Sequence, residues 1–274
     1  MIPNILSIAG SDPSGGAGIQ ADIKAISANG GYAMAAITAL TAQNTQGVQA
    51  VELIAPDLVV AQIASLRDDI AIHAVKIGML GSAAITDTVT AALAGLDAPI
   101  VLDPVMVAKS GDRLLAAEAV AALRDRLLPR ATVITPNLPE AADLLGQPPA
   151  TDLAGMEAQG RALLALGPQA VLMKGGHLGG PDSPDLLIAA DGVRRFDGPR
   201  HATRNTHGTG CSLSSALACL LGRGLPLPQA VAGAKLWLSG AIAASGALRV
   251  GQGHGPVHHF HAVNEGGQGA SPPA

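Results

Sequence analysis

The stretch 4-NILSIAGSDPSGGAGIQAD-22 decides the fold class of this chain. It begins with an almost uninterrupted apolar run of strand length, passes through a glycine-rich turn, and enters a segment that can form a helix. Strands that are covered on both faces, as in parallel sheets, have continuous apolar runs of this kind. The stretch therefore predicts a β-strand followed directly by an α-helix.

The same alternation of strand and helix continues along the chain. Further apolar runs of strand length occupy residues 32–40, 72–79, 99–105, 131–136 and 170–175. Helical patterns occupy residues 57–70, 83–95, 116–128 and 152–166. This alternation predicts an α/β fold, a three-layer sandwich in which a mostly parallel central sheet carries helices on both faces.

The helix predicted over 57–70 can be described in more detail. Asp57 follows a proline and is expected to cap the N-terminus of this helix. The helical spacing predicts a common buried face made of Leu58, Ile63, Leu66 and Ile70.

The last third of the chain has a different pattern. Residues 185–198 predict a β-hairpin around the turn dipeptide Asp191-Gly192. Two helices are expected to follow, near 210–223 and 227–247.

The chain contains no repeat and no linker that would mark a domain boundary. We therefore expect one domain over residues 1–263. The tail 264-NEGGQGASPPA-274 is rich in Gly, Pro and Ser and is expected to be disordered.

Composition excludes one large class of partner. The chain of 274 residues is 14% charged with a formal net charge of −4, and its lysines and arginines are scattered. That distribution argues against a polyanion as the main partner. One Trp, one Tyr and two Phe leave no aromatic platform on which bases could stack. We therefore expect no nucleic-acid partner.

The N-terminus and the cysteines indicate the compartment. The chain starts without a basic segment, and no run of about 18 uncharged apolar residues occurs, so no membrane association is expected. Cys211 and Cys219 lie roughly 12 Å apart along a predicted helix, whereas a disulfide needs Cα atoms within about 7 Å. The default prediction is a reducing, cytoplasmic location.

Polar residues follow several of the predicted strands, where α/β proteins bind ligands. Asp103 ends one strand, Asn137 and Glu140 lie three residues apart at a helix start, and Lys174 ends another strand. Taken singly, each has an ordinary structural explanation, such as capping a helix or favouring its dipole. Together, acids for Mg²⁺ and a lysine for phosphates are typical of phosphoryl transfer. No P-loop motif is present.

The stretch 203-TRNTHGTGCSLSSALA-218 adds a turn that can bind an anion. The sequence His-Gly-Thr-Gly leads into a helix of small residues, and Cys211 stands where the turn becomes the helix. Two alternatives are open for this residue, a buried packing cysteine or a reactive thiol at a phosphate-binding helix start. Cys219, deeper in the same helix, is interpreted as a packing residue.

These motifs, taken together, resemble one family. The markers are 7-SIAGSDPSGGAGIQADIK-24, 38-TALTAQNTQGV-48, 76-KIGML-80, 102-LDPVMVAKSGDRLL-115, 134-ITPNLPEA-141, 172-LMKGGH-177, 205-NTHGTGCSLSSALA-218 and 253-GHGPVHHFHA-262. They look like the hydroxymethylpyrimidine/phosphomethylpyrimidine kinases of thiamin biosynthesis, in the ribokinase-like superfamily. The resemblance covers about residues 4 to 263. It implies a kinase that uses MgATP to convert 4-amino-5-hydroxymethyl-2-methylpyrimidine to its monophosphate and then to its diphosphate, and a homodimer.

The resemblance also implies a pyrimidine pocket formed by Gly10, Ala17, Gln43, Met79 and Val105. Relatives carry Glu or Gln at the position of Gln43. A side-chain amide can accept from an exocyclic amine and donate to the adjacent ring nitrogen, so it suits a neutral pyrimidine. Asp22, in the first marker, is interpreted as support for the helix.

The remaining site residues that the resemblance implies concern ATP and the metal. Mg²⁺ would be organised by Asp103, Asn137 and Glu140, directly or through water. The ATP phosphates would be approached by Lys174 and Lys109. The backbone amides of the anion hole would come from Gly208, Thr209 and Gly210.

The resemblance places Cys211 where the wider superfamily carries an aspartate base. A helix N-terminus lowers the pKa of a thiol, which predicts that this cysteine acts as the base. We hypothesise why a thiol stands there. The second substrate is a phosphate monoester whose oxygen is already anionic. A fixed carboxylate about 4 Å away would cost around 4 kcal/mol at a dielectric of 20.

Two alternative functions remain open from the sequence. Pyridoxal is also a flat nitrogen heterocycle with a hydroxymethyl group, so a pyridoxal or pyridoxine kinase of vitamin B6 salvage is the nearest rival among enzymes. A non-catalytic pyrimidine-binding sensor would be expected if the metal and base residues were missing. All of them are present in this chain.

Overall fold

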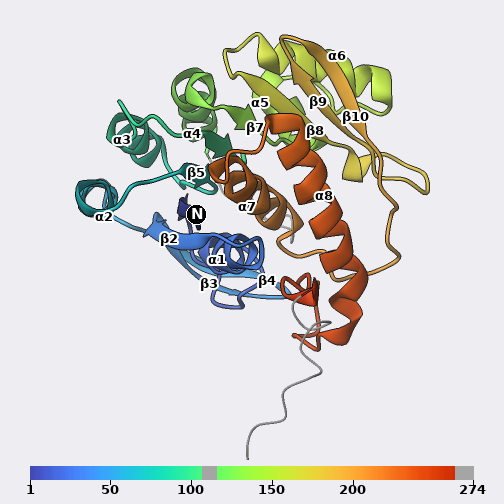
Figure 1. Ribbon diagram of the computed structural model, residues 1–274, viewed down its shortest axis with the longest axis horizontal. Helices are drawn as coiled ribbons and strands as arrows, with labels where there is room; N and C mark the ends of the chain where they lie inside the picture. Colours follow the sequence, from blue (N-terminus) through green and yellow to red (C-terminus); the bar gives the residue numbers. More distant parts are fainter. Residues whose placement is uncertain (107–115, 263–274) are drawn as a thin grey trace, which may run out of the picture.

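The computed structural model describes residues 1–106 and 116–262. Its centre is an eight-stranded sheet with the strand order β10-β9-β8-β7-β6-β5-β1-β2 (Figure 1). The strands are β1 (Asn4–Ala9), β2 (Tyr32–Ile37), β5 (Ala74–Ile77), β6 (Ile100–Leu102), β7 (Val133–Ile134), β8 (Ala170–Lys174), β9 (Asp185–Ala189) and β10 (Gly192–Phe196). Neighbouring strands from β8 through β7, β6, β5 and β1 to β2 pair in parallel. Strand β9 pairs antiparallel with both β8 and β10 at one edge of the sheet. The α/β prediction is confirmed.

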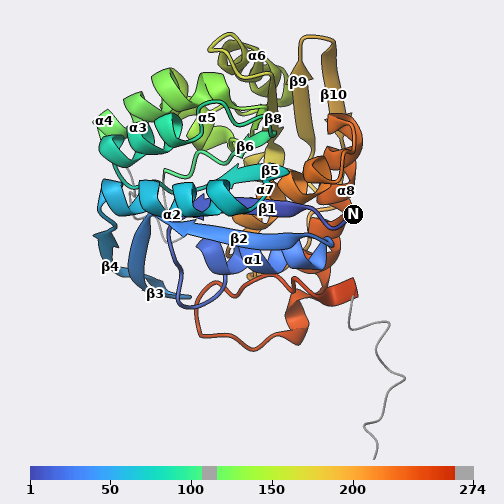
Figure 2. The same ribbon diagram turned by 60° about the vertical axis from the view of Figure 1, so that its left-hand side comes forward.

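Helices cover both faces of this sheet (Figure 2). One face carries α1 (Gly18–Ala28), α7 (Thr209–Gly222) and α8 (Leu227–Ala243). The other carries α2 (Pro56–Asp69), α3 (Ala83–Ala92), α4 (Ala117–Ala122), α5 (Leu138–Leu145) and α6 (Leu153–Leu164). A short π-helix at Leu123–Leu127 and a 3₁₀ helix at Leu128–Arg130 follow α4, a 3₁₀ helix at Gly175–His177 follows β8, and another at Ala244–Ala247 follows α8. Each face has its own hydrophobic core, and side chains of the sheet contribute to both cores. The three-layer arrangement is therefore as predicted.

The strand predicted over 32–40 is divided in the structure. Strand β2 ends at Ile37, and the chain then enters a separate two-stranded sheet, β3 (Ala39–Asn44) and β4 (Gly47–Leu53). Thr38 lies at the break. Its amide donates to Ala9 O and its hydroxyl donates to Met79 O, 2.7 Å away, which ties the change of direction to the end of β1. The hairpin β3–β4 was not predicted, because its residues do not form the continuous apolar run that marks a strand buried on both faces.

Two details of the 57–70 prediction are wrong. Asp57 does not cap α2, since the cap residue is Ala55 and Pro56 occupies the first turn. Proline is favoured there because the first helical residue has no N–H partner to lose. Leu58 is exposed, and Val59 takes its place in the core beside Ile63. Helix α2 therefore begins at Pro56, two residues before the start that a cap at Asp57 would give, and Val59 replaces Leu58 on the buried face.

The hairpin predicted over 185–198 is confirmed, but its turn lies one residue earlier than the predicted dipeptide Asp191-Gly192. Strands β9 and β10 pair antiparallel with Ala189 opposite Gly192, so the two connecting residues are Ala190 and Asp191. Gly192 begins β10 at a φ of 127°, a conformation that favours glycine. None of the helices in the described part of the chain combines the length and the apolar character that a membrane span needs. The tail 264–274 lies outside the described residues.

Candidate active site

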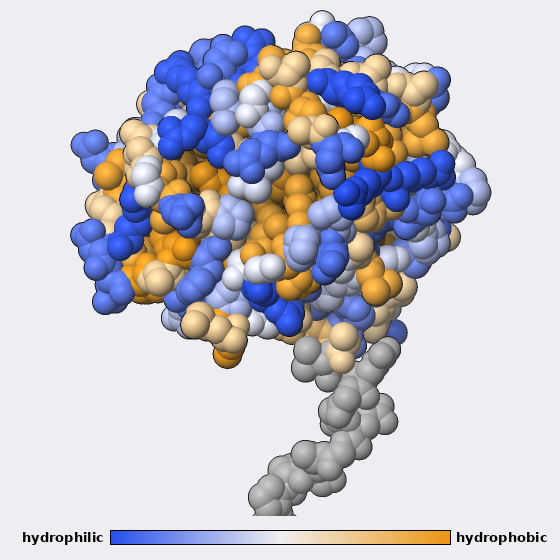
Figure 3. Space-filling model, turned by 45° about the horizontal axis from the view of Figure 1, so that its top comes forward, coloured by the Kyte–Doolittle hydropathy of each residue, from blue (hydrophilic) through white to orange (hydrophobic). Residues whose placement is uncertain are grey.

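The parallel strands bring the predicted site residues to one edge of the sheet. Gly10 follows β1, Met79 lies just beyond β5, Asp103 follows β6, Asn137 lies beyond β7, and Lys174 ends β8. They line a cavity of about 1010 Å³. All the described site residues from the sequence line it: Gly10, Ala17, Gln43, Met79, Asp103, Val105, Asn137, Glu140, Lys174, Gly208, Thr209, Gly210 and Cys211. Lys109 lies outside the described residues. One face of the molecule is hollowed, with apolar residues in the hollow and hydrophilic residues around it (Figure 3).

Asp103 and Lys174 form the charged centre of the cavity. Lys174 Nζ lies 2.9 Å from Asp103 Oδ1, which also accepts a hydrogen bond of 2.9 Å from Thr135 Oγ1. The other oxygen, Asp103 Oδ2, is buried and has no hydrogen-bond partner among the described residues. Burial alone would raise the pKa of Asp103, but Lys174 and then Lys76 hold it below its usual value. The site thus contains an ionised carboxylate with one oxygen available for a cation.

Asn137 and Glu140 cap helix α5. The side chain of Asn137 accepts from the Glu140 amide at 2.9 Å, and Glu140 Oε2 accepts from the Asn137 amide at 2.8 Å. These two reciprocal hydrogen bonds form a capping box. Helix capping is the structural explanation that the sequence left open for Asn137 and Glu140. Glu140 also lies 3.7 Å from Lys174 Nζ. Burial raises the pKa of Glu140 to about 7 although Lys174 opposes the shift.

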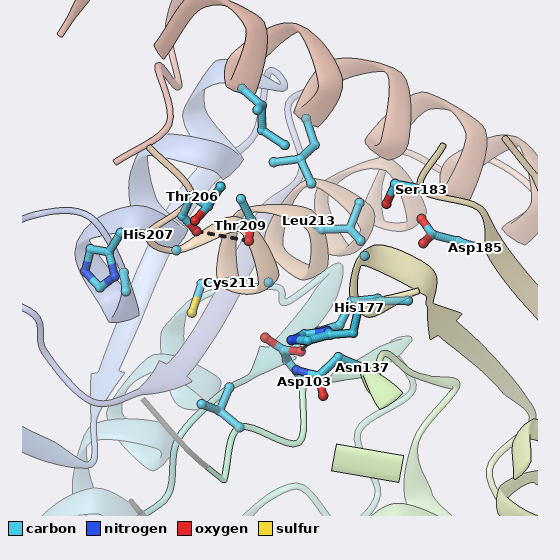
Figure 4. Close-up of a pocket in the computed structure, with 18 of the residues that line it drawn as sticks. Asp103, Asn137, His177, Ser183, Asp185, Thr206, His207, Thr209, Cys211 and Leu213 are labelled. Atoms are coloured by element: carbon cyan, nitrogen blue, oxygen red, sulfur yellow. Dashed lines mark hydrogen bonds and ion pairs between the residues drawn. The ribbon is translucent and has the colours of Figure 1, made fainter. Parts of the chain in front are cut away.

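The glycine turn before α7 faces this charged centre. Gly208 has a φ of +74° and is the residue that precedes the first turn of α7. A Cβ at Gly210 would lie 3.3 Å from both Asp103 Oδ2 and Lys174 Nζ. The first amides of a helix have no carbonyl partner one turn earlier and can bind an anion. Thr209 bonds locally, from its hydroxyl to Thr206 O (Figure 4).

The thiol of Cys211 points into the space between His207 and Asp103 (Figure 4). The prediction of a lowered pKa is wrong, because burial raises the pKa of Cys211 to about 11. Lys76 opposes the shift, whereas Asp22 and Asp103 add to it. A helix N-terminus favours a thiolate by a partial charge only, and here the loss of solvent outweighs it. A pKa in this range keeps most of the Cys211 thiol protonated at neutral pH.

Cys219 has the packing role that its sequence position suggested. It is fully buried, and its sulfur lies 3.6 Å from Ile26 O and 3.5 Å from Asn29 O. Both cysteines are free, as their spacing predicted.

The interpretation of Asp22 as helix support is wrong. Its carboxylate accepts from Lys76 Nζ at 2.9 and 2.8 Å, from Ser7 Oγ at 2.6 Å and from Ser215 Oγ at 2.8 Å. Lys76 and Asp22 are both fully buried. The sequence did contain a signal, since a lysine inside an apolar strand run is almost never fully buried without a partner. The partner could not be read from the sequence.

One side of the cavity, where the resemblance implies the pyrimidine pocket, is formed by the first glycine turn (residues 10–18) and the small sheet of β3 and β4. A Cβ at Gly10 would lie only 2.6 Å from Met79 Cε, so the backbone of this turn and Met79 form one continuous wall. Gln43 extends from β3. Its Oε1 accepts from Thr41 Oγ1 at 3.3 Å, and the same hydroxyl donates to Ser11 O at 2.8 Å. The small sheet and the first glycine turn are therefore joined beside Gln43.

The opposite side of the cavity was missed by the sequence reasoning. It lies between α7, α8 and the segment that follows β10, where Leu213, Leu238 and Ile242 provide an apolar wall. Asp185 accepts from Lys235 Nζ at 2.6 Å and from the Gly175 amide at 3.0 Å. Figure 4 shows Ser183 and Asp185 at this side and His207 at the other. The cavity therefore extends well beyond the residues that the sequence predicted for the site.

The fold and the site together define a class. A mostly parallel sheet with helices on both faces holds a carboxylate–lysine pair opposite the glycine turn that starts a helix. This arrangement is that of the ribokinase-like kinases, which are phosphotransferases.

Comparisons with known proteins are more specific. A family model described as phosphomethylpyrimidine kinase matches residues 12–258. The hydroxymethylpyrimidine/phosphomethylpyrimidine kinase of Salmonella typhimurium is 56% identical over 260 residues, which cover 94% of this chain and 98% of that protein. The chain belongs to the phosphomethylpyrimidine kinase family.

Solved structures extend the comparison to the fold. The phosphomethylpyrimidine kinase of Clostridium difficile is 42% identical with a TM-score of 0.78, and the match covers 88% of this chain and 99% of that one. The pyridoxal kinase of Bacillus subtilis, solved as an ADP complex, is 33% identical with a TM-score of 0.88, and the match covers 96% and 100%. Both activities are thus carried by closely similar structures.

Proposed function

We propose that the protein phosphorylates 4-amino-5-hydroxymethyl-2-methylpyrimidine on its hydroxyl and then phosphorylates the monophosphate to the diphosphate, for thiamin diphosphate biosynthesis. ATP is the phosphoryl donor. The observation that carries the proposal is the contact between the glycine turn and the charged pair, since Gly210 faces both Asp103 Oδ2 and Lys174 Nζ. A phosphoryl group in transfer needs hydrogen-bond donors and cations on one side, and a metal ion bound by carboxylates nearby.

Mg²⁺ fits the residues present. The buried and unpartnered Asp103 Oδ2 is an oxygen ligand of the kind that Mg²⁺ prefers, and Glu140 adds a second carboxylate. No cluster of three or more His, Cys, Asp or Glu side chains that could hold a metal occurs within 1–106 and 116–262. This agrees with Mg²⁺, which takes one or two carboxylates and completes its shell with water and phosphate oxygens. Bound there, it would neutralise charge on the phosphates.

Residues of the chain supply the remaining parts. The Lys174 ammonium would attract the transferred phosphoryl group, and Lys109 would add a second cation. The amides of Gly208, Thr209 and Gly210 would bind the developing negative charge. In its thiolate form, Cys211 would accept the proton of the pyrimidine hydroxyl in the first reaction. Asn137 would act through its cap on α5, because its side-chain oxygen is already bonded to the Glu140 amide.

The pyrimidine would lie between the first glycine turn and Met79, with Gln43 at its amino edge. Gly10, Ala17 and Val105 would complete the pocket. The apolar wall of Leu213, Leu238 and Ile242 would receive the adenine ring on the other side of the transferred phosphate. The two subsites then meet at the Asp103–Lys174 pair.

The function is tested by a coupled ATP assay with hydroxymethylpyrimidine, its monophosphate and pyridoxal side by side. We expect turnover of both pyrimidines at a higher kcat/KM than that of pyridoxal. A higher kcat/KM for pyridoxal would overturn the proposal in favour of the second candidate, which the similarity to pyridoxal kinases supports. No release of ADP with any of them would instead favour a binding protein.

We also infer a homodimer in the cytoplasm. Exposed apolar side chains occur on the small sheet and on α2, which follows it: Leu40, Val51, Leu53, Leu58 and Val60. Exposed apolar surface of this kind favours a protein contact. Sedimentation velocity measures the assembly directly, and a monomer at micromolar concentration would contradict it. The two free cysteines agree with a reducing compartment.

A further inference from the structure

The first glycine turn is organised by one buried carboxylate. Asp12 is almost fully buried, and its two oxygens accept from the backbone amides of Ser14 at 2.8 Å, Gly16 at 3.2 Å and Ala17 at 2.8 Å. Burial would raise the pKa of Asp12, but the hydrogen bond from His207 and those from the turn lower it below its usual value. Ala17 is the residue that precedes α1 and lines the cavity. Asp12 thus fixes the wall of the pyrimidine pocket.

The same carboxylate is bonded to the glycine turn of α7. His207 Nε2 lies 2.8 Å from Asp12 Oδ2, across 195 residues of sequence, and both side chains are buried. An ionised carboxylate only accepts hydrogen bonds, so Nε2 must carry the proton. His207 directly precedes Gly208. Figure 4 shows its ring turned away from Asp103, toward the N-terminal part of the chain.

The two glycine turns also touch through their backbones. A Cβ at Gly208 would lie 1.7 Å from Gly16 O, and a Cβ at Gly16 would lie 2.3 Å from the His207 ring. Neither turn can therefore move relative to the other without losing the contact with His207. The two turns therefore form a single unit, in which the distance between the wall of the pyrimidine pocket and the anion hole is fixed.

A third segment meets the same residue. The backbone amide of His207 donates to Gly255 O at 3.0 Å. Two residues earlier in that segment, Gly253 donates to Thr45 Oγ1 at 3.1 Å, and the amide of His254 donates to Thr45 O at 2.9 Å. Thr45 lies at the tip of the β3–β4 hairpin that carries Gln43. The C-terminal segment thus connects the hairpin to the anion hole.

We propose that His207 is a positioning residue that holds the pyrimidine pocket at reacting distance from the anion hole, acting through Asp12 on one side and Gly255 on the other. This inference rests on the proposed phosphorylation of the pyrimidine. It assigns His207 no proton transfer. Its role is to fix the separation between the hydroxyl of the substrate and the phosphoryl group, because a misplacement of about 1 Å can lower a rate about a hundredfold.

Two polar substitutions separate this role from simple folding. In His207→Gln the amide nitrogen can reach the place of Nε2 and keep the bond to Asp12. In His207→Asn the amide reaches only the place of Nδ1, and the bond is lost. We expect His207→Asn to lower kcat ten- to hundredfold for both pyrimidine substrates, and His207→Gln to stay within about threefold of wild type. His254→Gln, an exposed histidine of the same C-terminal segment, is the matched control.

Binding is measured separately by calorimetry. Because each turn keeps its own contacts, the Kd for hydroxymethylpyrimidine alone and the Kd for ADP alone should each change less than about threefold in His207→Asn. A loss confined to one Kd with an unchanged kcat would overturn the proposal, since His207 would then build a single subsite. Equal losses in the Gln and Asn variants would overturn it as well. Wild-type turnover in the same assay tests the proposed function independently.

A double-mutant cycle tests whether the two residues act through each other. If Asp12→Asn and His207→Asn each lower kcat by the same mechanism, the double variant should be no slower than the slower single variant. Multiplied losses would show two unrelated effects and would contradict the proposal. Cooperative melting of each variant is measured first, and the Gln and Asn variants of His207 carry the test should Asp12→Asn not fold.

Discussion

The ammonium group of Lys76 lies within 2.9 Å of both carboxylate oxygens of Asp22, and neither side chain is exposed. The pair connects strand β5 to helix α1. Ser215, one turn after Cys211 on α7, donates to the same carboxylate. A buried ion pair thus lies beneath the helix that forms the anion hole.

Removing one charge of this pair should be more harmful than removing both. We expect Lys76→Met to lower the free energy of unfolding by about 3–5 kcal/mol, because the Asp22 carboxylate stays buried without its partner. The double variant Lys76→Met/Asp22→Asn should recover much of that loss. Urea unfolding with linear extrapolation measures both. A double variant as unstable as Lys76→Met would show that the lysine stem, not the charge, is what matters.

Asp103→Asn should weaken the metal site while keeping the hydrogen-bond geometry around it. The substitution keeps an oxygen for the hydrogen bonds from Lys174 and Thr135, and it replaces only the unpartnered Oδ2 by an amide. We expect kcat to fall by about two to three orders of magnitude, with a higher Mg²⁺ concentration for half-maximal rate. Asp191→Asn, in the exposed hairpin turn, serves as control. Unchanged Mg²⁺ dependence would rule out Asp103 as a ligand.

Gly208→Ala should abolish most activity, because a Cβ there would lie 1.7 Å from Gly16 O. Gly224→Ala is the matched control. Gly224 also has a positive φ, 84°, but a Cβ there meets nothing within 4 Å. In both variants an alanine must adopt a positive φ, which costs about 1 kcal/mol of stability. Only Gly208→Ala also displaces the anion hole. Initial rates and melting temperatures are compared, and equal activity in the two variants would contradict the assignment.

Cys211→Ala should slow the first phosphorylation far more than the second. A general base contributes about 10²–10⁴-fold to the first reaction, whereas the oxygen of the monophosphate is already anionic and needs none. The raised pKa of Cys211, about 11, sharpens the hypothesis: the thiolate form would act as the base in the first reaction, and the neutral form, which predominates, does not repel the anion in the second. Each step is measured with its own substrate, and Cys219→Ala is the buried control. Equal losses in both steps would refute it.

Stability should fall on acidification because of His259. Burial, then Lys24 and His258, lower its pKa to about 4 from 6.5. Its contribution is complete above about pH 6.5 and is lost as pH falls toward 4, since only the unfolded chain binds the proton there. The shift corresponds to about 3 kcal/mol. The unfolding free energy of His259→Gln should vary less with pH over this range. An identical pH dependence in the variant and in wild type would contradict the prediction, and the exposed His254→Gln should match wild type.

Residues that follow strands were predictable because parallel strands place their carboxyl ends at one edge. Asp103, Glu140 and Lys174 were found in this way, and they converge as expected. The sequence did not show that Val59 rather than Leu58 is buried, because neighbouring apolar residues fit a helical period almost equally well. The break at Thr38 depends on contacts with Ala9 and Met79, which the local sequence does not contain.

The sequence by itself determined the α/β architecture, the edge of the sheet at which the predicted site residues lie and the residue types that meet there, since hydrophobic periodicity and the alternation of strands and helices along the chain are local properties. Only the tertiary structure decided the ionisation of Cys211, the partner of Asp22 and the bond between Asp12 and His207. The physical reason is the same for all three. Burial and charge pairing depend on which distant segments pack together, and these partners lie between 54 and 195 residues apart in the chain.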